Sequence, residues 1–341
     1  MNWKVALVLA VTAGCLVVVL WGLDMGTVRA QVAGFAWWVM LPSVACYFAS
    51  HLLRCWRMRL LLDRPLGLGR LLSVNSIGFL AINVVPLRLG EFVRPWLFLE
   101  QDGIPFGASL AAVFMERLLD VAMLLVLLLL VGLLVPLPPG GVPVHGVDVL
   151  GGGIRMASAI LGVGALTGLA VLVAGEPAIR LVTRPIARLS PSFGERAGSL
   201  LRAFRGTVAA LVRRPGRTLA LLALSAGVWA CTIVGIRTVY AGADLEGLGF
   251  RAATVNWGIT LAAMTALPTP GFFGPYEAAS SAALRLFGLK PEHAVATAVI
   301  THLGQFAFTI GLGTIFLLAA GLSLREVVRR SREAGRGAAP G

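Results

Sequence analysis

The chain has 341 residues, of which 57% are hydrophobic and only 13% are charged, with a mean hydropathy of +0.86. A soluble domain carries about 25% charged residues, so this composition excludes an ordinary water-soluble enzyme. The net charge of +13 could suggest a nucleic-acid partner, but nine of the 29 basic residues lie in one segment, 176–217. Most of the others flank apolar segments and would orient a membrane protein. No nucleic-acid partner is therefore expected.

Apolar segments in chain order predict an all-α polytopic membrane protein. Six windows without Asp, Glu, Lys or Arg are each long enough to cross a hydrocarbon core, which takes about 20 residues. A further apolar stretch, 106–135, contains three charged residues. The first window is longer than the usual core of a signal peptide, so we expect a retained helix there. The charge-free windows are 5–23, 32–53, 156–175, 218–236, 252–276 and 294–324.

The distribution of basic residues predicts the topology. Five lie in 54–70, nine in 176–217 and five in the tail 325–341, which places these segments and both termini in the cytoplasm. Between a cytoplasmic loop and an external loop the chain must cross the membrane an odd number of times. If the apolar stretches 71–99 and 252–289 each crossed the membrane, the number of crossings would become even. Each of the two is therefore expected to enter and leave the membrane on the same side.

Proline and glycine interrupt both of these stretches. Proline removes a backbone donor and glycine permits a tight reversal, so each stretch is expected to form a re-entrant helical hairpin. Irregular backbone at membrane depth survives only where protein or a wet cavity surrounds it. The prediction is about six transmembrane helices plus these two hairpins. The expected apex residues are Asn83, Pro86 and Gly90 in the first hairpin, and Pro268, Pro270, Gly271 and Gly274 in the second.

The two halves also match weakly at an offset of 186 residues. Glu91 corresponds to Glu277, Pro105 to Pro291, and Glu116 to His302. The predicted topology inserts the two hairpins from opposite sides, which gives inverted repeats, an arrangement typical of secondary transporters. The expected organisation is one transmembrane domain, 1–324, with repeats at about 71–135 and 252–322, a cytoplasmic amphipathic segment at about 177–214, and a basic tail, 325–341.

Ionisable residues near the hairpins are the candidate site. Arg88, Glu91 and Arg94 share a helical face and either lie solvated at the hairpin mouth or hold a phosphate together with the helix N-terminus. Glu116, Arg117 and Asp120 lie about 15 Å into the next helix, where charges must pair, line water or protonate. Glu277 and His302 occupy the symmetric positions. The histidine is either a structural hydrogen-bonding residue or part of a proton relay.

Three motifs carry a resemblance to a known family. They are Asn83-Val-Val-Pro-Leu-Arg-Leu-Gly-Glu-Phe-Val-Arg94, Met115-Glu-Arg-Leu-Leu-Asp120 and Leu267-Pro-Thr-Pro-Gly-Phe-Phe-Gly-Pro-Tyr-Glu277. In order and spacing they resemble the transmembrane domain of the lysylphosphatidylglycerol synthetase/flippase family, the flippase-like half of multiple peptide resistance factor. The resemblance implies a lipid translocase of the inner membrane. Phe272 and Phe273 depart from the family pattern, and the chain lacks the soluble aminoacyl-transferase domain, so synthesis of a lysyl-lipid is not expected.

The leading interpretation is a lipid flippase rather than an enzyme. Its substrate would be an anionic phospholipid or a polyprenyl-phosphate-linked lipid of the bacterial cytoplasmic membrane, with the headgroup held by Arg88, Glu91, Arg94, Glu116, Arg117, Asp120, Glu277 and His302. No cofactor or metal is expected, because the four cysteines form no CxxC pair and no nucleotide-binding or metalloprotease motif is present. A polyprenyl-phosphate-sugar glycosyltransferase and a non-transporting scaffold are the alternatives. A homo-oligomer and a coupling proton are left open.

Overall fold

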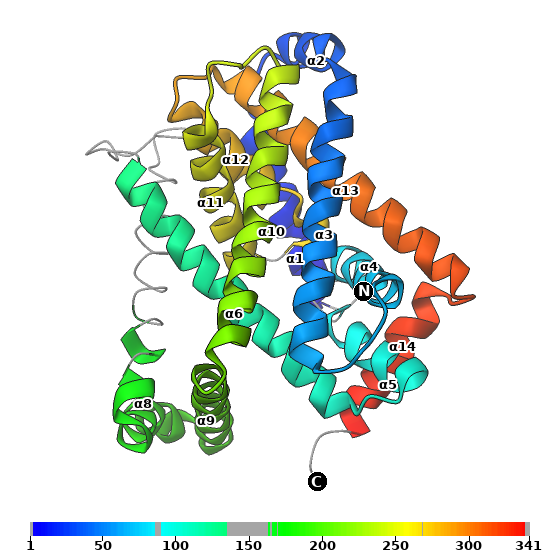
Figure 1. Cartoon of the computed structure of the whole chain (residues 1–341). Helices are drawn as coiled ribbons and strands as arrows, with labels where there is room; N and C mark the ends of the chain where they lie inside the picture. The colour runs from blue at the N-terminus through cyan, green and yellow to red at the C-terminus, as the bar shows by residue number, and fades with distance from the viewer. Residues whose placement is uncertain are drawn as a thin grey trace. The chain divides into compact units, whose positions relative to one another are not determined.

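The computed structural model describes residues 3–85, 90–134, 163, 166–168, 170–267 and 269–337. All regular secondary structure in these residues is helical (Figure 1). The expected apex residues Pro86 and Pro268, and the candidate site residue Arg88, lie outside the described residues. The chain divides into two compact units, one formed by 1–150 with 224–341 and the other by 151–223.

Two described helices are long and apolar enough to cross a membrane, and a bent pair makes a third if it forms one span. The two are α10 (Pro215–Gly242) and α13 (Pro291–Ala319). The pair joins α2 (Met25–Gly34) to the helix Trp37–Leu62, which contains η1 (Trp37–Val39) and α3 (Met40–Leu62), with a bend of 68°. The protein is thus an all-helical membrane protein, and the expected six spans and the depth of the hairpins stay predictions.

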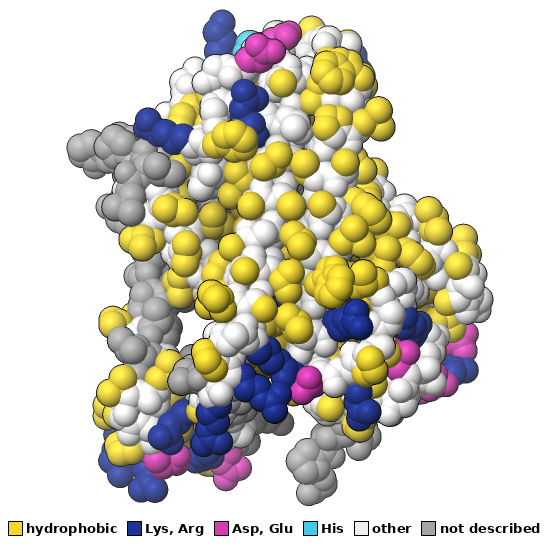
Figure 2. Space-filling view, in the orientation of Figure 1, with side chains coloured by type: hydrophobic (Ala, Val, Ile, Leu, Met, Phe, Trp, Pro, Cys, Tyr) yellow, Lys and Arg dark blue, Asp and Glu magenta, His cyan; other side chains and the backbone are white. Residues whose placement is uncertain are grey.

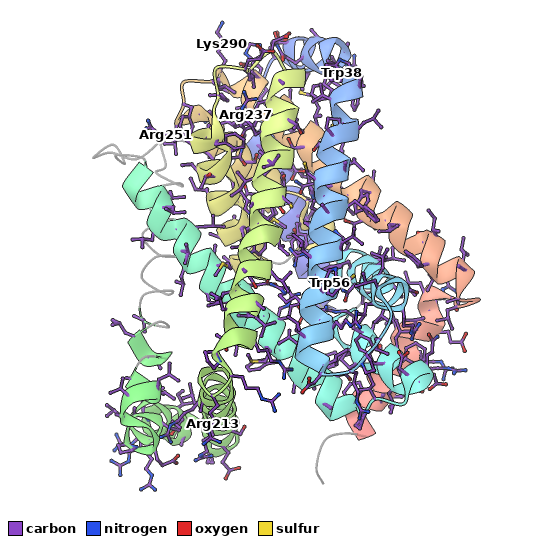
Figure 3. The ribbon with its side chains drawn as sticks, in the orientation of Figure 1. Trp38, Trp56, Arg213, Arg237, Arg251 and Lys290 are labelled. Atoms are coloured by element: carbon purple, nitrogen blue, oxygen red, sulfur yellow. The ribbon has the colours of Figure 1, made fainter. Side chains whose placement is uncertain are left out.

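Exposed tryptophans mark the two ends of an apolar surface on α3. Trp38 is 72% exposed and Trp56 is 43% exposed, and they are separated by about 27 Å at the rise of an α-helix. Figure 2 shows hydrophobic side chains covering α3 and the adjoining part of α10 between them. Arg237, Arg251 and Lys290 lie at the same end as Trp38 (Figure 3). Tryptophans at this spacing are typical of residues that sit at the two interfaces of a hydrocarbon core about 30 Å thick.

The first broken stretch folds as an antiparallel helical hairpin. Its helices are α4 (Leu68–Val84) and α5 (Val93–Asp102). Arg70 at the start of α4 forms an ion pair of 2.9 Å with Asp102 at the end of α5, so the chain returns to the level at which it entered. Gly90 lies so close to the end of α4 that a Cβ atom there would be 2.4 Å from the backbone of Ala81. Only glycine fits at this close approach.

The second broken stretch forms an equivalent hairpin from α11 (Phe250–Ala266), η3 (Pro270–Phe272) and α12 (Pro275–Arg285). Its open ends meet where the Arg251 guanidinium lies 5.8 Å from the centroid of the Phe287 ring. The turn between its helices needs left-handed backbone, with φ of 59° at Gly271 and 92° at Gly274. These two residues lie at the turn between the helices, and Pro270 begins η3.

Each hairpin packs against the long helix that follows the other hairpin. The long helices are α6 (Phe106–Leu134) after the first hairpin and α13 after the second, and α6 contacts α11 while α13 contacts α4. A glycine permits close approach in both interfaces. Gly258 of α11 faces Val131 of α6, and Gly313 of α13 faces Leu80 of α4. This reciprocal packing is the arrangement that two related halves would form. The remaining helices of this unit are α1 (Trp3–Leu20) and α14 (Leu324–Gly337).

The second unit contains α8 (Glu176–Leu189) and α9 (Pro191–Val212). The two helices contact each other, and Ala178 and Ile179 of α8 form a small buried apolar cluster with Val171. A hydrogen bond from the Arg202 side chain lowers the pKa of Glu176 below its usual value. The segment 177–214, which we expected to be amphipathic, contains most of α8 and all of α9, and its association with a membrane surface stays a prediction.

Candidate functional site

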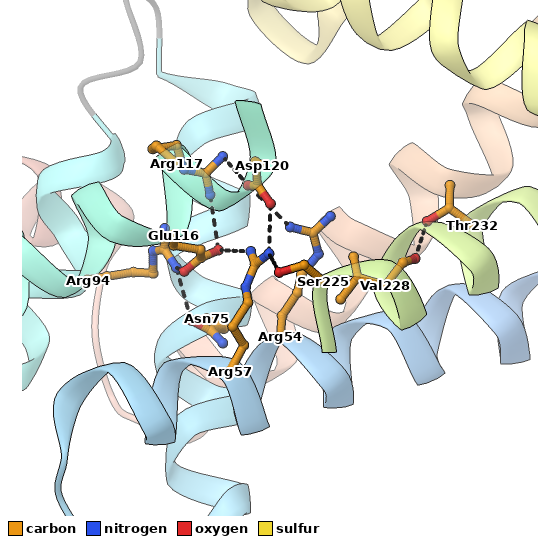
Figure 4. A network of polar contacts seen from close by, with 10 residues as sticks. All are labelled: Arg54, Arg57, Asn75, Arg94, Glu116, Arg117, Asp120, Ser225, Val228 and Thr232. Carbon is orange, nitrogen blue, oxygen red and sulfur yellow. Dashed lines mark hydrogen bonds and ion pairs between the residues drawn. The ribbon is translucent and has the colours of Figure 1, made fainter. Parts of the chain in front are cut away.

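The arginines and carboxylates of α3, α5 and α6 form one group, which we call the charge cluster. At its centre Arg57 is fully buried and contacts two carboxylates of α6, at 3.1 Å to Glu116 and 2.8 Å to Asp120. Arg57 also donates a hydrogen bond of 3.1 Å to Ser225 of α10 (Figure 4). A buried charge requires pairing and hydrogen bonding, and Arg57 has both through Nη1, whereas its Nε and Nη2 have no hydrogen-bond partner among the described residues. The cluster consists of Arg54, Arg57, Arg94, Glu116, Arg117 and Asp120.

Arg94 joins the first hairpin to this cluster. Its guanidinium forms an ion pair of 2.7 Å with Glu116 and donates a hydrogen bond of 3.3 Å to the side-chain oxygen of Asn75. Its aliphatic stem crosses α4 at Gly78, where a Cβ atom would lie 2.4 Å from the Arg94 Cγ. Glycine at this position therefore makes room for the arginine, and the carboxylate of Glu116 is shared between Arg57 and Arg94.

Arg54 and Arg117 form the accessible edge of the charge cluster. Arg117 bonds to Glu116 at 3.1 Å and to Asp120 at 3.3 Å, and its side chain is 30% exposed. Arg54 lies 3.9 Å from Asp120 and over the ring of Trp229 at 5.1 Å. If Glu91 is included, the described part of the site holds four arginines and three carboxylates, an excess of one positive charge. Arg117 and Asp120 are three residues apart on α6, so they lie on the same face of the helix.

In the second hairpin Glu277 and His302 contact each other. One carboxylate oxygen of Glu277 lies 2.5 Å from His302 Nδ1, and the other accepts a hydrogen bond of 2.7 Å from the backbone N–H of Gly274. His302 Nε2 lies 2.9 Å from the carbonyl oxygen of Gly271. The ring of Tyr276 stacks on the imidazole with the centroids 4.1 Å apart. Both side chains are buried, so this Glu277–His302 bridge ties α12 and α13 to the turn between α11 and α12.

A cavity of about 330 Å³ connects the two regions. Its lining includes Arg54, Arg117 and Asp120 of the charge cluster and Phe272 and His302 of the second region. Glu91 and Asn83 of the first hairpin also face it. Both hairpins therefore contribute residues to one cavity. Aromatic rings form much of the remaining wall, including those of Tyr47, Phe79, Trp229, Trp257, Tyr276 and Phe306.

Sequence reasoning missed the two arginines of α3. It assigned Arg54 and Arg57 to a basic cytoplasmic loop, 54–70, but α3 continues to Leu62 and places both in the charge cluster, with Arg57 buried and Arg54 half-buried. The signal that could have found Arg54 is its seven-residue spacing from Tyr47, which puts both on one face of a helix. The carboxylate partner of Arg94 is Glu116 on α6. Among the described residues, no group of three or more His, Cys, Asp or Glu side chains is placed to hold a metal ion.

Comparison with known proteins identifies the family. The sequence model of the family described as the lysylphosphatidylglycerol synthase transmembrane region matches residues 5–313. The chain belongs to this family. It is also 28% identical over 273 residues to a protein of Haloferax volcanii named glycosyltransferase AglD. The matched region is 73% of this chain and 43% of that protein, so this family member spans less than half the length of its curated relative. No solved structure matches the chain.

Proposed function

We propose that this protein is a membrane flippase for lipids with an anionic phosphate headgroup, and that it is not an enzyme. The headgroup would bind in the cavity between the two helix breaks while the acyl chains stay in the bilayer. The observation that carries the proposal is a cavity lined by residues of both hairpins, with Arg54 and Arg117 in its wall. A volume of about 330 Å³ lies at the lower end of the range for small-molecule sites and suits a headgroup rather than a whole lipid.

The electrostatics of the site support an anionic ligand. Glu116 and Asp120 compensate Arg57 and Arg94 only in part, because the same carboxylates also serve Arg54 and Arg117. An excess positive charge in an apolar surrounding costs free energy until an anion neutralises it. A phosphate can accept charge-assisted hydrogen bonds from two guanidinium groups at once, which is the geometry that arginine favours.

The position of the charge cluster favours headgroup entry from one side. Arg57 follows Trp56 directly, and Trp56 is exposed on the apolar surface near one proposed interface. We place that interface on the cytoplasmic side of a bacterial cytoplasmic membrane, together with both termini, because basic residues are retained there. The headgroup would then pass from the charge cluster toward His302.

The test is transbilayer movement of fluorescent phosphatidylglycerol in proteoliposomes, read by access of a membrane-impermeant quencher. The double variant Arg54→Gln and Arg117→Gln should slow movement by roughly 100-fold, because two charge-assisted hydrogen bonds are lost at about 1.5 kcal/mol or more each. The matched control is Arg237→Gln, which removes an arginine that bonds to the Glu246 carbonyl away from the cavity wall. Equal rates in the double variant and the wild-type protein would sink the proposal and favour a scaffold.

A second candidate function is sugar transfer from a polyprenyl-phosphate donor. The name of the Haloferax volcanii relative and the presence of Asp120 and Glu91 in an aromatic cavity favour it. Asp120 would then act as the general base, although it already accepts from Arg57 and Arg117. Transfer of labelled sugar in detergent, where no second membrane face exists, would support this reading and contradict the flippase.

A further inference from the structure

The contacts of His302 fix how many protons the Glu277–His302 bridge contains. Nε2 faces the carbonyl oxygen of Gly271, which can only accept, so Nε2 carries a hydrogen. Nδ1 lies 2.5 Å from a carboxylate oxygen of Glu277, and two lone pairs cannot approach so closely. One proton must therefore lie between them. The pair is electrically neutral as a whole, whether that proton belongs to the imidazole or to the carboxyl group.

We propose that the Glu277–His302 bridge is the proton-binding site of this carrier and that an anionic headgroup and a proton bind together. The proposal rests on the flippase function and adds the coupling ion to it. When the proton leaves to solvent, a neutral imidazole and a carboxylate remain, and the N–H···O bond between them is lost. The buried pair then carries one negative charge in place of none, which requires a compensating positive field.

The cavity supplies that positive field when no headgroup is bound. His302, Arg54 and Arg117 line the same cavity, so uncompensated guanidinium charge stabilises the deprotonated bridge when no headgroup is present. A bound phosphate neutralises those arginines and removes this stabilisation. Headgroup binding therefore strengthens proton binding, and by linkage the proton strengthens headgroup binding by the same factor.

Proton release would also loosen the second helix break. The bridge holds α13 to the turn through the Gly271 carbonyl, and Glu277 caps α12 through the Gly274 N–H. Phe272 between them has a left-handed φ of 60°, a conformation that costs a non-glycine residue roughly 1 kcal/mol or more. The contacts around this turn hold it in that conformation. The hydrogen bond that contains the bridge proton is one of those contacts.

Other titratable and charged groups face the bridge from the elements packed around it. Cys15 of α1 lies beside Gly274, and the Tyr276 ring covers the imidazole. Tyr47, His51, Arg54, Glu91, Arg117 and Asp120 share the cavity with His302. A pH dependence in the wild-type protein must therefore be assigned by substitution within the bridge.

Glu277→Gln is the decisive variant because its side-chain amide reproduces the protonated bridge. The amide N–H can donate to His302 Nδ1, and the amide oxygen can accept from the Gly274 N–H. Purified protein in weakly buffered detergent solution would be titrated with phosphatidylglycerol, with binding measured by calorimetry and proton uptake by a pH-sensitive dye, between about pH 5 and pH 9. The wild-type protein should take up as much as one proton per bound lipid at a pH near the middle of the transition between the deprotonated and the protonated bridge. Glu277→Gln should bind the lipid and take up none.

Two further variants keep the test decisive. His302→Gln also removes the titrating bridge and should abolish proton uptake, whereas His293→Gln, on the same helix, should retain it. Wild-type binding without uptake at any pH, or unchanged uptake in Glu277→Gln, would overturn the proton site and leave the flippase intact. Absence of phosphatidylglycerol binding would instead count against the flippase itself. The histidine ¹⁵N spectrum without lipid should change with pH in the wild-type protein and stay constant at position 302 in Glu277→Gln, and an invariant wild-type signal would contradict the proposal.

Discussion

The two halves of the transmembrane unit share an architecture and differ in chemistry. In the first half α4, α5 and α6 form a hairpin followed by a long helix, and in the second α11, α12 and α13 do the same. An asparagine on the first helix of each hairpin contacts its second helix, Asn75 with Arg94 and Asn256 with Ser280. Arg94 and Ser280 are separated by the repeat offset of 186 residues. The repeat is therefore visible in contacts as well as in sequence.

The chemical difference is the way in which each half compensates its buried polar groups. The first half uses ionic pairs, with Glu116 shared between the buried Arg57 and Arg94. The second half uses a neutral, proton-containing bridge and hydroxyl and amide contacts. Ionic pairs have a fixed charge at neutral pH, whereas a histidine–carboxyl pair can exchange a proton. In the proposed function, the first half would attract the anion and the second half would exchange the proton.

The largest expected effect is loss of stability in the ionic half. Glu116→Gln leaves two buried guanidinium groups without their shared carboxylate, and we expect a loss of about 3–5 kcal/mol in the free energy of unfolding. The measurement is reversible unfolding in mixed micelles. Glu100→Gln is the control, because the Glu100 pair with Arg330 is exposed and should contribute at most about 1 kcal/mol. If both variants unfolded alike, Glu116 would not be the shared partner of buried arginines.

An intermediate effect should distinguish the two reciprocal interfaces. A Cβ atom at Gly313 would lie 2.5 Å from the Leu80 Cβ and 2.7 Å from the Ser76 carbonyl, so Gly313→Ala must separate α13 from α4. We expect a loss of about 1–3 kcal/mol in the same unfolding measurement. At Gly258 the close neighbour is the Val131 Cγ2 at 2.9 Å, the end of a side chain that can move, so Gly258→Ala should be milder.

The control for this comparison is Gly311→Ala on the exposed face of α13, where a Cβ atom meets no heavy atom within 4 Å. Helix propensity alone should make this variant as much as about 1 kcal/mol more stable. Equal destabilisation by Gly313→Ala and Gly311→Ala would mean that α13 does not pack closely against α4.

The smallest effect is expected where the substitution preserves neutrality. Glu277→Gln should change the free energy of unfolding by less than about 1 kcal/mol, because the amide can make both hydrogen bonds of the protonated carboxyl group. Replacing glutamate by glutamine should therefore lower the free energy of unfolding severely at Glu116 and only mildly at Glu277. A loss at Glu277 as large as that at Glu116 would show that the second half also depends on an ionised carboxylate. Glu277→Leu, which removes both hydrogen bonds, should be clearly less stable than Glu277→Gln in the same measurement.

The sequence by itself determined the membrane class, the family, the two broken stretches and most of the charged residues of the site. Composition sets the solvent of the chain, and proline and glycine mark where a helix must stop, so both signals are local. The sequence could not show that Arg57 belongs to the site, because arginines just beyond an apolar window look the same whether they enter solvent or turn inward. Only the helical spacing from Tyr47 pointed to Arg54. It placed Glu277 and His302 at related positions without showing that they contact each other.

Only the tertiary structure decided which charges pair, because pairing depends on which helices become neighbours. Arg57 reaches Glu116 because α3 lies beside α6, and His302 reaches Gly271 because α13 passes the reversal of the second hairpin. The cost of burying a charge forces such groups to find partners, but it does not specify which ones. That choice is made by helix packing, through contacts such as those at Gly78, Gly90 and Gly313, which fix the distances between elements far apart in the sequence.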